Sequence, residues 1–144
     1  MTQAWKQAWD DLQQGLRKGR GPNRWHARPL LLALGQALLE GRTAEAEQLE
    51  QQLRSIPAPH RDTWVEAVLE ELNLAVTEHV HSADPRYLSR PDYDWGYTLA
   101  AREGLEARLR AAEALDIETP PALVEQVLKA DERLAPFLNR GETL

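Results

Sequence analysis

The sequence predicts an all-α protein, folded as a single-domain bundle of about six helices. Leu occurs 23 times and Ala 20 times, whereas Val and Ile together occur 8 times; Leu and Ala favour helices, while β-branched residues favour strands. Apolar residues recur at the helical period, and no segment alternates apolar and polar residues over six positions. A length of 144 residues is typical of one domain, so we expect residues 1–144 to share one core.

Glycine, proline and capping residues divide the first part of the chain into three predicted helices. A stripe of apolar residues predicts a first helix over residues 3–17, which glycines and a proline then end. A second helix is expected to begin near Pro29, because proline suits the first turn, and to end before Gly41. The third is expected to begin at Thr43, whose hydroxyl suits an N-cap, and to end at Pro57.

The same signals predict two long helices in the middle of the chain. Asp62 is the expected N-cap of a fourth helix that stops before Pro85. Asp92 or Asp94 opens a fifth helix. Gly104 lies inside this fifth helix, where glycine is intrinsically unfavourable. We therefore expect Gly104 to mark the close approach of a second helix.

A sixth helix is predicted near the end of the sequence. Thr119 followed by two prolines is a strong helix start. Pro136 and Gly141 are expected to end this helix, and residues 139–144 are expected to fray.

Residues 30–55 resemble a single helical hairpin of the tetratricopeptide type, with the similarity concentrated in the run 32–47. They cover under a fifth of the chain, and no other segment repeats them. A solenoid needs several such repeats, so the resemblance implies no more than one helical hairpin.

The composition excludes several classes of protein. The chain has no Cys, which excludes a disulfide scaffold, a thiolate zinc site, an iron–sulfur cluster and a cysteine nucleophile. No apolar run approaches the roughly 18 residues of a membrane span, and the first residues lack the apolar region of a signal peptide. We therefore expect a soluble, cytoplasmic protein without membrane contact.

A basic segment, residues 17–28, is the first candidate binding site and is predicted to be a loop rich in Gly and Pro. It carries five permanent positive charges, one His and one Trp, and no acidic residue. Guanidinium groups bind phosphate or carboxylate through paired hydrogen bonds, and a Trp can stack on a base. An acidic partner protein, nucleic acid, and the chain's own acidic residues 42–84 are the three alternatives. The predicted partner- or phosphate-binding residues are Arg17, Lys18, Arg20, Arg24, Trp25 and Arg28.

An aromatic segment, residues 87–97, is the second candidate and holds four of the nine aromatic residues. Tyr and Trp supply rigid contact area with a polar group, as in binding hot spots. We expect Tyr87 and Tyr93 to be accessible, and Trp95 and Tyr97 to lie nearer the core. The alternative is that these rings seal one end of the bundle. The predicted interaction patch is Tyr87, Arg90, Tyr93 and Trp95.

The acidic and histidine residues of the fourth helix do not complete a metal motif. Glu78 and His81 have the three-residue spacing of di-metal bundles, but the second such pair is missing. The glutamates at positions 66, 70 and 71 likewise give no Glu-x-x-Glu pair of the kind that binds magnesium in all-α pyrophosphohydrolases. We predict no metal, no cofactor and no catalytic residue. A metal-dependent hydrolase built on Glu70, Glu71, Glu78 and His81 is the weakest alternative.

These features together favour a small non-catalytic interaction or regulatory protein over an enzyme. We expect it to bind a protein partner through the basic segment, the aromatic segment or both. The alternative is a nucleic-acid-associated helical protein that uses the basic segment on phosphates. The sequence leaves a homo-oligomer open.

Overall fold

A computed structural model describes the backbone of residues 4–142 and the side chains of residues 5–137. This part of the chain contains seven α-helices and no strand, which confirms the all-α prediction. The helices are α1 (Ala4–Arg17), α2 (Arg24–Leu39), α3 (Thr43–Arg54), α4 (Ala58–Ser82), α5 (Pro85–Leu88), α6 (Trp95–Ala114) and α7 (Pro121–Glu142).

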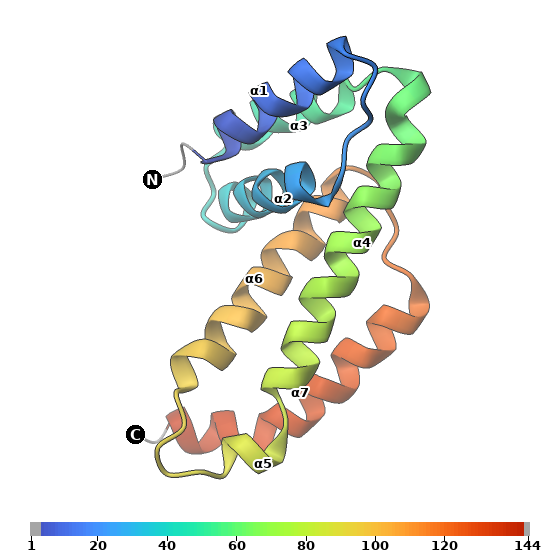
Figure 1. Cartoon of the computed structure of the whole chain (residues 1–144). Coiled ribbons are helices and arrows are strands. Elements are labelled where there is room, and N and C mark those ends of the chain that lie inside the picture. The colour runs from blue at the N-terminus through green and yellow to red at the C-terminus, as the bar shows by residue number, and fades with distance from the viewer. Residues whose placement is uncertain (1–3, 143–144) are drawn as a thin grey trace.

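The helices form two connected groups (Figure 1). α1 and α3 pack against α2, and α2 crosses α4 and α6. Below this crossing, the long helix α4 packs against α6 and against α7, with the short helix α5 at the far end. A continuous apolar core joins α1, α2, α3, α4, α6 and the start of α7. A smaller cluster around Leu88 and Leu134 closes the α5 end.

α2 begins five residues earlier than predicted, at Arg24 instead of Pro29. Asn23 supplies the cap: its side chain accepts a hydrogen bond from the Trp25 backbone N–H, and the His26 ring accepts one from the Asn23 N–H. This capping box starts the helix upstream of the proline. The predicted loop is therefore wrong for residues 24–28, which are helical.

Three further boundaries differ from the prediction. α4 begins at Ala58 with a proline in its first turn, not at Asp62. The short helix α5 was not predicted; the Asp84 side chain caps it. α7 continues through Pro136 to Glu142, so the segment expected to fray is helical up to that residue, and residues 143–144 lie outside the described part. The predicted cap of α6 by Asp94 is confirmed.

The close helix approach predicted at Gly104 occurs instead at Gly35. A Cβ atom on Gly35 would lie 1.8 Å from the carbonyl oxygen of Ala107, so the α2 and α6 backbones touch at this point. A Cβ atom on Gly104 would meet only the Nη1 atom of Arg108, 2.9 Å away within the same helix. The glycine that packing requires is thus on α2, against Ala107 of α6.

Candidate functional site

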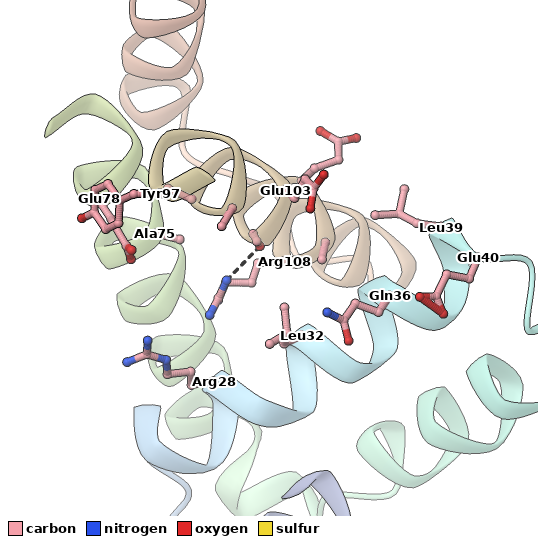
Figure 2. Close-up of a pocket in the computed structure, with 15 residues that line it drawn as sticks. Arg28, Leu32, Gln36, Leu39, Glu40, Ala75, Glu78, Tyr97, Glu103 and Arg108 are labelled. Atoms are coloured by element: carbon pink, nitrogen blue, oxygen red, sulfur yellow. Dashed lines mark hydrogen bonds between the residues drawn. The ribbon is translucent and has the colours of Figure 1, made fainter. Parts of the chain in front are cut away.

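A groove of about 610 Å³ lies where α2, α4 and α6 meet (Figure 2). α2 and α6 touch at Gly35 and Ala107. Because the two helices cross, they diverge away from this contact, and the α6 residues that line the space between them are mostly small. Larger apolar side chains border the groove from both helices: Leu32 and Leu39 on α2, and Tyr97 on α6. The small lining residues are Ala75, Ala100, Ala101, Gly104 and Ala107.

The groove presents apolar surface to solvent. Leu39 is 47% exposed and Tyr97 is 46% exposed. Neither belongs to the residues predicted as a site, and Tyr97 was expected near the core. One sequence signal does point to the groove: Ala100, Gly104 and Ala107 are spaced by four and three residues, and therefore form one small-residue face of α6.

The groove is bordered by more negative than positive charge. Its carboxylates are Glu40, Glu78, Glu103 and Glu106, and its basic residues are Arg28 and Arg108. Glu40 pairs with Arg42, and Glu106 pairs with Arg102 and Arg110. Glu78 and Glu103 have no hydrogen bond or ion pair within the described residues, and their carboxylates are open to a ligand.

A buried ion pair lies beside the groove. The Arg108 Nε donates to the Glu71 Oε1 at 3.1 Å. Its Nη1 donates to the Gly104 carbonyl at 2.8 Å, the bond dashed in Figure 2. The Arg28 Nε lies 3.9 Å from the same Glu71 oxygen. Burial raises the pKa of Glu71, while Arg108 and then Arg28 oppose that increase. Glu71 and Arg108 therefore join α4 to α6.

The residues of the hydrolase alternative do not form a metal site. Glu71 is bound to Arg108, and the Glu70 Oε1 lies 3.9 Å from the Arg24 Nε. The His81 ring lies beside the Tyr87 ring, with 5.8 Å between their centroids. Within the described part of the chain, no group of three or more His, Asp or Glu side chains is placed to hold a metal ion.

The basic segment is divided between two environments. Arg24 and Arg28 lie toward Glu70 and Glu71 on α4, as the self-pairing alternative expects. Arg24 also covers the Trp25 ring, with 4.7 Å between the guanidinium carbon and the ring centroid, and Trp25 remains 65% exposed. The other three cations, Arg17, Lys18 and Arg20, are exposed without an ion pair among the described residues. Within the described residues, two of the five cations thus lie near carboxylates of α4 and three do not.

Most of the aromatic segment closes the end of the bundle. The Tyr93 hydroxyl hydrogen-bonds to the Thr98 hydroxyl at 2.5 Å, and the Tyr93 ring meets Trp95 edge-on with 6.0 Å between centroids. Tyr93 and Trp95 are both half-buried. The predicted order of accessibility is thus reversed, since Tyr97 is more open than Tyr93. Tyr87 is half-buried beneath the cation of Arg90, 5.2 Å from its ring centroid.

No protein-family model, curated protein or solved structure matches this chain. Across the described residues, no helix has the length and apolar character required to cross a membrane.

Proposed function

We propose that the protein is a non-catalytic protein-binding module whose groove between α2, α4 and α6 holds a segment of a partner protein. The observation that carries the proposal is the combination of exposed apolar side chains, a row of small residues and unpaired carboxylates on one concave surface. Arg28, from the basic segment, and Tyr97, from the aromatic segment, both line this groove. One end of each predicted binding segment thus contributes to it.

The size and lining of the groove suit binding more than catalysis. Its volume of about 610 Å³ lies within the range of about 300–1,000 Å³ that is typical of ligand sites. A segment seated over the alanines and glycine would remove the exposed faces of Leu39 and Tyr97, at the two ends of the groove, from water (Figure 2). The free carboxylates of Glu78 and Glu103 have no His, Ser, Thr or Cys beside them among the described lining residues with which to form a base–nucleophile pair.

A peptide-display selection on the immobilised protein tests the proposal. Ala100→Trp fills the groove from an exposed position on α6, so it should block binding without disturbing the core. Ala135→Trp is the matched control, because Ala135 is an exposed helical alanine on α7 outside the groove. Circular dichroism and denaturant melts verify that both variants fold.

We expect peptides that are enriched on the wild type and on Ala135→Trp to bind Ala100→Trp at least about tenfold more weakly. The proposal is wrong if no peptide is enriched, or if the enriched peptides bind the folded Ala100→Trp variant as well as the wild type.

A further inference from the structure

We infer that the segment which the groove accepts is basic as well as apolar: a bulky apolar side chain flanked by Lys or Arg residues that pair with Glu78 and Glu103. This inference rests on the proposed function and specifies the chemistry of the partner. It follows from which charges of the groove are free and which are already neutralised within the chain.

Most of the free charge of the groove is negative. Glu40 and Glu106 are neutralised by arginines of the chain, whereas Glu78 on α4 and Glu103 on α6 are exposed and have no partner among the described residues. Each contributes an open carboxylate from a different helix (Figure 2). A ligand cation can therefore pair with either carboxylate without breaking an existing ion pair.

The positive charges are less available. Arg108 is buried and bonded to Glu71 and to the Gly104 carbonyl. Arg28 is exposed, and its Nε lies 3.9 Å from the Glu71 oxygen that already pairs with Arg108, so Arg28 is the one cation of the groove left without a carboxylate of its own among the described residues. Glu78 lies seven residues beyond Glu71 on α4, or about 10 Å along the helix axis. An anionic segment would find this one arginine and meet carboxylates along the rest of the groove.

The apolar part of the segment is set by the shape of the groove. The small residues of α6 and Ala75 leave room for a large side chain near Leu32, and Leu39 and Tyr97 supply apolar contacts for the segment at the two ends of the groove. Apolar burial in such a hollow provides most of the affinity, and charges at the edge select the partner and speed its association. A neutral apolar segment is therefore a poorer fit than a basic one.

The experiment is a charge-reversal selection. The same peptide library is selected on the wild type and on the double variant Glu78→Lys/Glu103→Lys. Glu66→Lys/Glu132→Lys is the control, because it makes the same change in net charge at exposed, unpaired glutamates outside the groove. Peptides selected on the wild-type protein should be enriched in Lys and Arg. They should bind the Glu78→Lys/Glu103→Lys variant at least about tenfold more weakly than the wild type, and this difference should shrink at high salt. The groove variant should instead select acidic peptides.

The outcomes separate this inference from the proposed function. Peptides that are lost on Ala100→Trp but carry no excess of Lys and Arg overturn the inference and leave the proposed function intact. Equal weakening by the groove and control variants also overturns it, since the effect is then one of overall charge. If no peptide binds, both fail. A concentration-dependent dimer in sedimentation that Ala100→Trp abolishes makes a second copy the occupant, and overturns the inference of a separate partner.

Discussion

Two charged clusters, each with buried members, join α4 to its neighbours in different ways. Beside the groove, Glu71 pairs with Arg108 of α6. Farther along α4, the fully buried His79 contacts Asp131 of α7, with 2.7 Å between the His79 Nε2 and the Asp131 Oδ1. Arg102 of α6 binds both oxygens of Asp131, at 3.0 and 3.2 Å. Both clusters therefore link three helices. The second does so through hydrogen bonds to Asp131, whereas in the first the contact with Arg28 of α2 is a longer ion pair of 3.9 Å.

The difference shows that similar charged pairs can lie between packed helices, as at His79 and Asp131, or beside an open groove, as at Glu71 and Arg108. The aromatic rings of Tyr93 and Trp95 pack over the core at the α5 end, and the His79 network joins α7 to this part of the molecule. At the other cluster, α2 and α6 are in backbone contact at Gly35 and then diverge, so Arg108 borders open space. The His79–Asp131–Arg102 cluster lies among packed helices, whereas the Glu71–Arg108 pair borders the groove.

Replacing Gly35 by Ala should have the largest effect, because it forces apart the two helices that form the groove. A Cβ atom 1.8 Å from a backbone oxygen must displace backbone, and we expect a loss of more than about 3 kcal/mol in the free energy of unfolding. Gly15→Ala is the control, since the nearest atom to its Cβ is 3.7 Å away, and it should be neutral or slightly stabilising. Urea denaturation measures the stability of both variants. Equal stability would contradict a tight contact between Gly35 and Ala107.

Breaking each charged cluster should give the next largest effects, and they should differ. Arg108→Met leaves the Glu71 carboxylate buried without its main partner, so we expect a loss of about 3 kcal/mol. Asp131→Asn keeps a hydrogen-bonding side chain beside His79 and should cost about 1 kcal/mol. The exposed neighbours Arg110→Met and Glu132→Gln are controls expected to change stability by less than about 0.5 kcal/mol. A greater loss for Asp131→Asn than for Arg108→Met would contradict this ranking.

The smallest predicted effect is a pH dependence that comes from His79. Burial lowers the pKa of His79 below 6.5, and the hydrogen bond and charge of Asp131 oppose this without reversing it. As the pH falls below 6.5, the unfolded chain binds a proton before the folded protein does, so stability is lost in that range, by at most about 1.4 kcal/mol per pH unit. His79→Gln should flatten this part of the stability–pH curve, whereas His81→Gln, at an exposed position, should retain it. Identical curves for the two variants would show that His79 is not the titrating group.

Glu71 should act with the opposite sign. Its pKa is raised by burial, so the folded protein keeps the carboxyl proton to a higher pH than the unfolded chain does. Its contribution is present below pH 4.5 and is lost as the pH rises above that value. The two clusters therefore differ in pH response as well as in geometry.

Local signals in the sequence located most helices but misplaced several ends. The helix starts predicted at Asp92 or Asp94 and at the prolines after Thr119 occur at Asp94 and Pro121, because caps and first-turn prolines act within a few residues. The start of α2 was predicted too late because the Asn23–His26 capping box outweighs the proline signal. Pro136 did not end α7. The helix is held there by packing in the apolar cluster around Leu88 and Leu134, which Phe137 also contacts.

The sequence by itself determined the helical class, the approximate positions of the long helices and the uneven distribution of charge, since composition and periodicity are properties of neighbouring residues. Only the tertiary structure decided which glycine lies at the α2–α6 contact, which aromatic ring is exposed and which carboxylates remain unpaired. Gly35 and Ala107 are 72 positions apart in the chain, and Glu78 and Glu103 are 25 apart. Such juxtapositions depend on how helices cross, and the period of a single helix carries no information about its partner.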